Sequence, residues 1–462
     1  MNQIVKDTGD GHNGANHNRF LLSETCFKGA EFMTGLNTNR RYFLGSGLAG
    51  LAMSASPLRA SANEKVRIAV IGTKSRGADL AGVFARNDGF EIAALCDADS
   101  NVYGKAQKNL VAAKRPEAKT ESDFRRLLDD KSIDAIAVAT PDHWHALMAV
   151  MGCQAGKHVY CEKPVSHNLV EGRRIVQAAR KYNRVVQCGI QRRSSTSVQE
   201  AVDLVRGGAV GKVGMARAWI HQIRPNIGHG KPGEVPKGVD YAMWQGPALD
   251  RPFHANRFHY NWHWFWNWGT GEIGNNGIHG VDVARWGLGV EGPSKVTSGG
   301  GKFIFDDDQE VPDTQIVTWE FPEKCVIQWE HRMWSKHPTE SAGFGIAWYG
   351  DKGTMVIGDK GWRIEDLDPK APPVAKSERP SRDGMTAHVQ NFLDCIKDGK
   401  RPNADIEIGH LSTRLCHLGN IAHRTGRKVT FDPSTESFPG DESANALLGR
   451  EYSNRFQMPS QV

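Results

Sequence analysis

Short apolar runs alternate with longer amphipathic stretches through the first half of the chain. The run Val66–Ile71 is continuous enough for a buried parallel strand, and a glycine-bearing turn and a helix-forming stretch follow it. The same pattern predicts further strands at 135–139, 158–161 and 185–190, with helices to about residue 155 and over 169–182 between them. Strands that alternate with helices predict a doubly wound parallel sheet.

The turn after the first strand carries the residue types of a dinucleotide-binding loop. It comprises Gly72, Thr73, Lys74, Ser75, Arg76 and Gly77. Glycine at 72 allows a tight turn, glycine at 77 allows close helix–strand packing, and N–H groups at the helix start face a pyrophosphate. Lys74 replaces the middle glycine of the usual fingerprint, so the surrounding strand–turn–helix–strand order carries the prediction.

An acidic residue, Asp97, ends the second strand 20 residues after Gly77. A carboxylate at this place accepts hydrogen bonds from the ribose hydroxyls and repels a 2′-phosphate. We therefore expect a Rossmann domain that binds NAD in preference to NADP. The alternative is a Rossmann-like fold that binds no nucleotide.

Polar clusters follow the later predicted strands. Ligands of a doubly wound sheet bind outside the carboxyl ends of its strands, so residues there are candidates for the cofactor cleft. We expect His143 and His145 to border the nucleotide rather than to bind a metal. The full set predicted from these clusters is Thr140, Pro141, His143, His145, Glu162, Lys163 and Gln191.

A segment rich in aromatic residues and histidine lies in the second half. Six of the 13 tryptophans fall between Trp244 and Trp286, and the alternation over 262–268 predicts a strand or extended loop with rings on one face. One interpretation is a carbohydrate pocket, because sugars pack their C–H faces on aromatic rings. The other is a buried core or a subunit contact. Histidines at 259 and 263 would not converge on a metal in an extended stretch, so we expect none.

The rest of the second half predicts a mainly β region followed by helices. Segments between Lys295 and Ile357 are β-rich, and helices are expected over 388–399 and 408–426. The proline-rich stretch Pro225–Pro252 predicts a long loop near the pocket, and a short helix is expected around 443–450.

Composition excludes several classes of protein. The net charge of +6 is small for 462 residues and no block of lysine and arginine stands out, which argues against a nucleic-acid partner. No apolar run reaches the roughly 20 residues of a membrane helix. Eight cysteines occur without a CxxC pair, so we expect reduced, buried packing residues.

The N-terminal region predicts an export address. Asn39-Arg40-Arg41-Tyr42-Phe43-Leu44 resembles the twin-arginine signal, and a Gly- and Ala-rich apolar stretch and Ala60-Ser61-Ala62 follow in the order of a cleavable leader. We expect residues 1–62 to be this leader, with translation starting at Met1 or Met33, and the protein to be exported, for instance to the periplasm, by the twin-arginine machinery. The alternative is a chance basic pair before a short helix.

Three motifs mark a resemblance to a known family. "ATPDHWH", "HVYCEKPVSHN" and "GTGEIGNNGIHGVDVARW" follow the glycine turn in this order, and the chain thereby resembles the Gfo/Idh/MocA oxidoreductases. The resemblance implies a Rossmann domain (63–190), a C-terminal α/β domain with a large open, mostly antiparallel sheet (191–385), and returning helices and a tail (386–462). It also implies hydride transfer between a nicotinamide and a sugar or polyol carbon, and homo-oligomers formed through the open sheet.

The resemblance also assigns catalytic residues. Lys163 corresponds to the lysine near the nicotinamide and the reacting hydroxyl, and His279 to the usual acid/base. Asn275 stands where many members have Asp; an amide only hydrogen-bonds, so proton handling would rest more on Lys163 and His279. Asp282, one helical turn after His279, either pairs with that histidine or serves within the fold as a helix cap or in a salt bridge. The expected substrate set is Lys163, Arg192, His259, His263, Trp264, Asn275 and His279.

An exported dehydrogenase needs a cofactor that stays bound, because free NAD is scarce outside the cytoplasm. We therefore expect an oxidoreductase that retains its nicotinamide while it acts on a carbohydrate. Two alternatives remain: an NAD-dependent glycosidase that works by transient oxidation and elimination, and a sugar-binding protein without catalysis.

Overall fold

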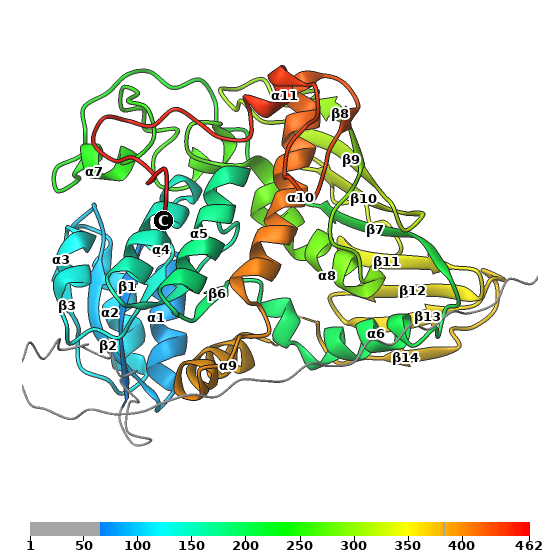
Figure 1. Ribbon diagram of the computed structural model, residues 1–462, viewed down its shortest axis with the longest axis horizontal. Helices are drawn as coiled ribbons and strands as arrows, with labels where there is room; N and C mark the ends of the chain where they lie inside the picture. Colours follow the sequence, from blue (N-terminus) through cyan, green and yellow to red (C-terminus); the bar gives the residue numbers. More distant parts are fainter. Residues whose placement is uncertain (1–64, 382–383) are drawn as a thin grey trace, which may run out of the picture. The chain divides into compact units, whose positions relative to one another are not determined.

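The computed structural model describes residues 65–381 and 384–462. The predicted leader, residues 1–62, lies outside the described residues. Two sheets organise the described part, and helices lie between them (Figure 1).

The first sheet is a six-stranded parallel sheet with the order β3-β2-β1-β4-β5-β6. The predicted alternation of strands and helices is confirmed, with ends that differ by up to two residues. Its strands are β1 (Val66–Ile71), β2 (Phe90–Cys96), β3 (Lys119–Glu121), β4 (Ala135–Val138), β5 (His158–Cys161) and β6 (Val186–Cys188). The helices that alternate with them are α1 (Arg76–Arg86), α2 (Tyr103–Ala112), α3 (Phe124–Asp129), α4 (Asp142–Gln154) and α5 (Leu169–Lys181).

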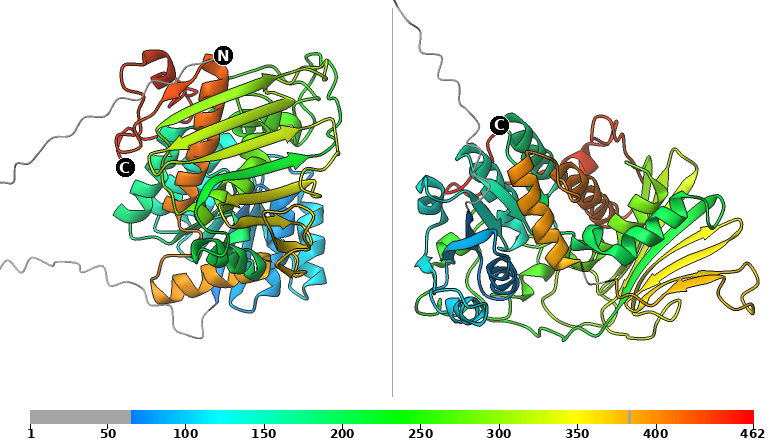
Figure 2. Two further views of the ribbon diagram at one scale, coloured as in Figure 1. Left: turned by 90° about the vertical axis from the view of Figure 1, so that its right-hand side faces the viewer. Right: turned by 90° about the horizontal axis from the view of Figure 1, so that it is seen from below.

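The second sheet has nine strands in the order β14-β13-β12-β11-β7-β10-β9-β8-β15. Only β7 and β10 pair in parallel, so the expected mostly antiparallel sheet is confirmed. Figure 2 shows that helices cover one face of this sheet and leave the other open. Its strands are β7 (Val213–His221), β8 (Lys295–Gly301), β9 (Thr314–Phe321), β10 (Cys325–Arg332), β11 (Phe344–Gly350), β12 (Gly353–Gly358), β13 (Gly361–Glu365), β14 (Ala375–Ser377) and β15 (Val429–Thr430).

Burial along β9 and β10 explains why this sheet has one covered face. Every second residue of β9, including Val317 and Trp319, is buried, while the residues between them are more accessible. A period of two places alternate side chains on opposite faces, so only one face needs a partner layer. That layer includes α6 (Thr196–Arg206) and α8 (Ile278–Leu288).

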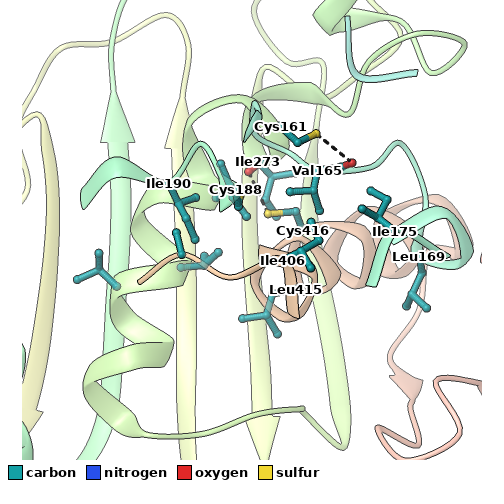
Figure 3. Close-up of a cluster of buried hydrophobic side chains, with 14 of the residues drawn as sticks. Cys161, Val165, Leu169, Ile175, Cys188, Ile190, Ile273, Ile406, Leu415 and Cys416 are labelled. Carbon is teal, nitrogen blue, oxygen red and sulfur yellow. Dashed lines mark hydrogen bonds between the residues drawn. The ribbon is translucent and has the colours of Figure 1, made fainter. Parts of the chain in front are cut away.

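Three helices of the described residues lie after β14 in the chain: α9 (Met385–Asp398) and α10 (Ile406–Thr425) before β15, and α11 (Glu442–Asn445) after it. α10 contacts α5 of the first domain and β8 and β9 of the second sheet. Figure 3 shows the buried side chains at this junction, where Cys188, Ile273, Leu415 and Cys416 gather. Close packing requires glycine here, because a Cβ at Gly409 would lie 2.6 Å from Cβ of Cys188.

A buried ion pair ties α8 to the segment after β6. Arg193 and Asp282 meet at 2.8 Å, and Ser412 on α10 donates its hydroxyl to Asp282. Of the roles considered for Asp282, the structure therefore shows the salt bridge within the fold. Arg285 also donates to Ser412, so one buried network joins α8 and α10.

Seven cysteines fall among the described residues, and all are buried with free thiols, as expected. No helix in the described part of the chain is long and apolar enough to cross a membrane.

Replacing Asp282 by Ala should destabilise the fold strongly, because the Arg193 guanidinium would remain buried without its carboxylate. Breaking a buried pair from one side typically costs about 3–5 kcal/mol of unfolding free energy. Urea unfolding would measure the loss. Glu378→Gln, at an exposed pair with Lys376, is the control and should change little; equal effects for both variants would contradict the prediction.

Candidate active site

A cavity of about 250 Å³ opens where β1, β2, β4 and β5 end. This is the edge at which a doubly wound sheet binds its ligands. The last residues of these strands form one wall, and a long segment of the second domain forms the opposite wall. The residues that line it include Gly72, Lys74, Ser75, Arg76, Asp97, Thr140, Pro141, Asp142, His145, Glu162, Lys163, Trp244, His259, Tyr260, Trp262, His263 and Asn275.

The glycine turn has the geometry that a pyrophosphate needs. Gly72 has φ +85°, and a Cβ there would lie 2.6 Å from the carbonyl oxygen of Ala139. A Cβ at Gly77 would lie 1.7 Å from the Gly72 oxygen, so the first turn of α1 packs directly on the loop. The residues present therefore fit a dinucleotide, with Lys74, Ser75 and Arg76 lining the cavity and Gly77 behind them.

The predicted ribose acid is held in place by backbone groups. The Asp97 carboxylate accepts hydrogen bonds from the Thr73 N–H at 2.7 Å and from the Asp99 N–H at 3.0 Å. Thr73 itself is fully buried and does not line the cavity. Burial raises the pKa of Asp97, and these N–H donors oppose that rise.

Glu162 and Arg76 join the two loops of the cleft. The Arg76 Nε lies 2.6 Å from Oε1 of Glu162, a carboxylate that is almost completely buried. Burial alone would raise the pKa of Glu162, but the Arg76 charge and hydrogen bond hold it below its usual value. Through its contact with Arg76, Glu162 thus holds the end of the glycine turn in place, and its carboxyl stays ionised.

Lys163 reaches across the cavity to the second domain. Its Nζ donates to the backbone oxygen of Asn275 at 2.7 Å and lies 3.3 Å from Oδ1 of the same residue. Burial lowers the pKa of Lys163, and the charges of Glu162 and Asp142 oppose that effect. The structure thus brings together two of the three predicted catalytic residues.

Asp142 is a cavity residue that the sequence analysis did not single out, although it stands within the "TPDHWH" motif. Its carboxylate accepts a hydrogen bond of 2.7 Å from the Thr270 hydroxyl. Burial raises its pKa to about 7, so it can hold or release a proton near neutrality. An acid within a predicted strand-end loop was the signal that could have found it.

The two histidines of that motif occupy different places. His145 lines the cavity, and its ring nitrogens lie 2.6 Å from the Pro164 oxygen and 2.8 Å from the Thr140 oxygen. His143 is buried against the Trp244 carbonyl and does not line the cavity. Burial lowers the pKa of His143 to about 3, so it is neutral at ordinary pH.

A segment of the second domain, residues 237–263, forms a strap over the cofactor side of the cavity. The Asp240 N–H donates to the Ala98 oxygen, and Ser100 donates to the Gly238 oxygen. His259, at a positive φ of 71°, places Nε2 2.5 Å from Asp99 Oδ2. The loop that carries the ribose acid is therefore fastened directly to the strap.

The aromatic segment does not form the extended stretch that its alternation predicted. Residues Asn261–Trp264 form a short 3-10 helix and turns follow it, because the rings are buried in several directions around one cluster. Trp262 lines the cavity, whereas Trp264 and Trp268 are buried in the cluster. The pocket and core interpretations therefore each apply to part of this segment.

His263 lines the cavity as a neutral base. Its Nδ1 lies 2.5 Å from the Tyr260 carbonyl oxygen, and its ring stacks on Trp262 at 3.6 Å. Burial lowers its pKa to about 3. Since the carbonyl can only accept, Nδ1 carries the proton and Nε2 is left as an acceptor.

Several predicted site residues lie elsewhere. His279 is half-buried on α8 and does not line the cavity. Arg192 is buried over the Phe344 ring, with its centre 4.3 Å from the ring centroid, and donates to Ser381. Gln191 lies with it in a short 3-10 helix after β6, outside the cavity lining. Within the described ranges, no group of histidine, cysteine and acidic side chains is arranged for a metal.

Comparison with family models matches both halves of this arrangement. The model described as "Oxidoreductase family, NAD-binding Rossmann fold" matches residues 66–190, and "Oxidoreductase family, C-terminal alpha/beta domain" matches residues 248–431. The fold and site thus define a nicotinamide-dependent oxidoreductase architecture. The chain belongs to the Gfo/Idh/MocA family and carries its NAD-binding domain.

Two curated relatives illustrate the range of activities in this family. The chain is 29% identical over 219 residues to an alpha-N-acetylgalactosaminidase of Shewanella oneidensis, covering 41% of this chain and 47% of that protein. It is 30% identical over 228 residues to inositol 2-dehydrogenase 2 of Saccharopolyspora erythraea, covering 49% and 55%. The chain therefore spans about half the length of these relatives.

Solved structures support the fold. The WlbA dehydrogenase from Bordetella pertussis, in complex with NADH and UDP-GlcNAcA, superimposes with a TM-score of 0.60 at 19% identity, covering 80% of this chain and 99% of that one. The aldose-aldose oxidoreductase from Caulobacter crescentus gives a TM-score of 0.61 at 21% identity, covering 80% and 100%.

Replacing Asp97 by Ala should weaken the preference for NAD over NADP by at least about tenfold, because the ribose acceptor and the charge that repels a 2′-phosphate are both removed. The ratio of the two dissociation constants, measured by fluorescence titration of nucleotide-free protein, checks this. Asp88→Ala, at an exposed carboxylate after α1, is the control. An unchanged ratio in Asp97→Ala would disprove the ribose assignment.

Proposed function

We propose that this protein is an NAD-dependent oxidoreductase that transfers a hydride between a retained nicotinamide and a hydroxyl-bearing carbon of a sugar or polyol. The observation that carries the proposal is the position of Lys163, which lies in one cavity with the glycine turn, the ribose acid and an aromatic wall. That wall offers Trp262 for a sugar's C–H face and His263 and Tyr260 for its hydroxyls.

In this mechanism Lys163 takes the proton of the substrate hydroxyl. Bound NAD would supply the hydride acceptor, held by the glycine turn and Asp97. Burial favours the neutral amine, which is the form able to accept a proton. Asp142, with its pKa of about 7, provides a second carboxyl in the same cavity that can hold a proton near neutrality. His263 keeps its Nε2 as an acceptor for a second hydroxyl.

The strap supports the retention of the cofactor. Hydrogen bonds at Ala98 and Ser100 and the His259–Asp99 contact close the ribose side of the cleft from the second domain. A cofactor that stays bound suits export by the twin-arginine route, which we also propose for this protein.

Replacing Arg40 and Arg41 together by Lys should leave the protein in the cytoplasmic fraction. Unchanged export of this double variant would refute the export signal.

We propose further that the protein is a homo-oligomer joined through the uncovered face of the nine-stranded sheet. Ile316 on β9 is exposed and alternates with the buried residues of the covered face, so its side chain lies on the opposite face. Among the described residues, no helix covers that face (Figure 2). Sedimentation equilibrium of wild type and Ile316→Glu tests this assignment. Equal masses for both would contradict it.

A second candidate is a glycosidase that oxidises a sugar transiently with the bound nicotinamide, eliminates the aglycone, adds water to the unsaturated intermediate and returns the hydride. The observation that favours it is the similarity to alpha-N-acetylgalactosaminidase. Oxidation next to a ring C–H makes that proton acidic, so glycoside cleavage in deuterated water would place deuterium on the product ring. An oxidoreductase would instead interconvert alcohols and carbonyls without ring deuteration or release of an aglycone.

The first measurement is of retained nucleotide. Protein purified without added cofactor and then denatured should release NAD or NADH in near-stoichiometric amount, because the strap must move before the dinucleotide can leave.

His259→Ala should speed exchange of the bound nucleotide with added NAD at least about tenfold, as the loss of one charge-assisted hydrogen bond predicts. His229→Ala is the matched control, because His229 also lies between β7 and α8 but is paired with Asp308 outside the strap. Empty wild-type protein would contradict retention.

Replacing Lys163 by Ala should lower kcat at least about a hundredfold, the usual scale of general acid–base catalysis. Lys163→Arg should be similarly impaired, because a guanidinium stays protonated and cannot accept the hydroxyl proton. Since the neutral amine is the active form, oxidation by the wild type should rise with pH through the lysine titration and fall below it. Stopped-flow hydride transfer across the pH range checks this; an active Lys163→Arg variant would exclude the base role.

A further inference from the structure

Glu272 lies behind the catalytic lysine, on the far side of Asn275. Its side chain is buried, and Oε2 accepts a hydrogen bond of 3.3 Å from Nδ2 of Asn275. Asn275 in turn presents Oδ1 to Nζ of Lys163. An unbroken chain thus runs from the Lys163 amine through one amide to the Glu272 carboxylate.

The polarity of this chain allows only one orientation of the amide. A protonated lysine only donates hydrogen bonds and an ionised carboxylate only accepts them. Asn275 has one acceptor and one donor group, so its oxygen must face Lys163 and its nitrogen must face Glu272. Glu272 therefore determines which atom of Asn275 the lysine meets.

Hydrogen bonds and an ion pair from neighbouring side chains fix the position of the Glu272 carboxylate. Gln222 donates to its Oε1 at 2.6 Å, Asn276 donates to the same oxygen, and Arg224 lies 3.4 Å from Oε2. Arg224 also donates to the Tyr260 hydroxyl, which links the carboxylate to the substrate wall. Glu272 does not line the cavity, so it acts on the reaction only through Asn275.

The hydrogen bonds to Asn275 fix the direction in which the Lys163 amine points. The Lys163 amine donates two N–H groups to Asn275, one to the backbone oxygen and one to Oδ1. The third substituent position on Nζ is therefore left to face the cavity. When the amine is neutral, that third position holds the lone pair. An amide turned the other way would offer an N–H to Lys163 and compete with the substrate for that lone pair.

We propose that Glu272 is a positioning residue that locks the Asn275 amide and thereby aims the reactive position of Lys163 into the cavity. The role presupposes proton transfer by Lys163, as proposed above. The charge of Glu272 also favours the protonated lysine, as do Glu162 and Asp142, while Arg76 opposes it. Two further titratable groups, His145 and His263, face Lys163 from the other walls and remain unchanged in the test.

The test compares Glu272→Gln with the double variant Glu272→Gln/Asn275→Asp. A glutamine can donate to Oδ1 of Asn275 and so permits the flipped amide; kcat should fall at least about tenfold, with NAD content unchanged and KM little affected. The double variant cannot present an N–H to Lys163 and restores a carboxylate beside it, so kcat should recover to within about threefold. Glu330→Gln is the matched control, because Glu330 on β10 is also a carboxylate paired with an arginine but lies outside the cavity lining.

A second readout does not depend on turnover. The pH dependence of Lys163 acetylation by trace acetic anhydride, read by mass spectrometry, reports the pKa of the lysine itself. It should move to lower pH in Glu272→Gln and return in the double variant. If the wild type oxidises no sugar, the proposed function fails, and a lysine titration that stays unmoved in Glu272→Gln would separately overturn the role of Glu272.

Wild-type kcat in Glu272→Gln would overturn the proposal, and so would an unmoved lysine titration. So would a loss of activity that the double variant does not recover, because that pattern indicates a structural role alone. Should Glu272→Gln not fold, Asn275→Ala removes the same amide with Glu272 intact; it must then reproduce the fall in kcat, and wild-type activity there would refute the proposal.

Discussion

The packing of α10 between the two domains is the constraint on which the site depends. At Gly419 of this helix a Cβ would lie 2.9 Å from Ile273 Cδ1, and the Cys416 thiol donates to the Ile273 backbone oxygen. Ile273 begins the π-helical turn Ile273–Gly277, which contains Asn275. The buried side chains around this helix (Figure 3) join it to β6 and to the segment that begins with Ile273. The same packing thereby holds the turn that carries Asn275, the partner of Lys163.

The first domain was predictable because its signals are local. A buried strand, a positive-φ glycine and an acid at the next strand end follow one another within 30-odd residues, and each reflects one packing or hydrogen-bonding need. Lys163 was likewise predictable, both from its strand-end position and from the family motif. Asn275 came from the resemblance alone, since nothing in its local pattern indicates a lysine partner.

The rest of the site depends on long-range contacts. The roles of Glu272, Asp142 and the His259–Asp99 pair follow from neighbours that lie far away in the chain, such as Gln222 and Thr270. The alternation of tryptophans predicted an extended strand, but tertiary burial of the rings on several sides favoured turns. Arg192 and His143 are polar residues with structural partners, which sequence position alone does not distinguish from ligands.

The distance along the chain between the two sides of the cleft has a consequence for biosynthesis. Asp99 and His259 are 160 positions apart, and the Rossmann half leaves the ribosome first. The strap that covers the nucleotide cleft is therefore translated only after the strand ends and the glycine turn on the other side of the cleft. For the retained cofactor proposed above, the time at which NAD enters is thus coupled to the completion of the second domain.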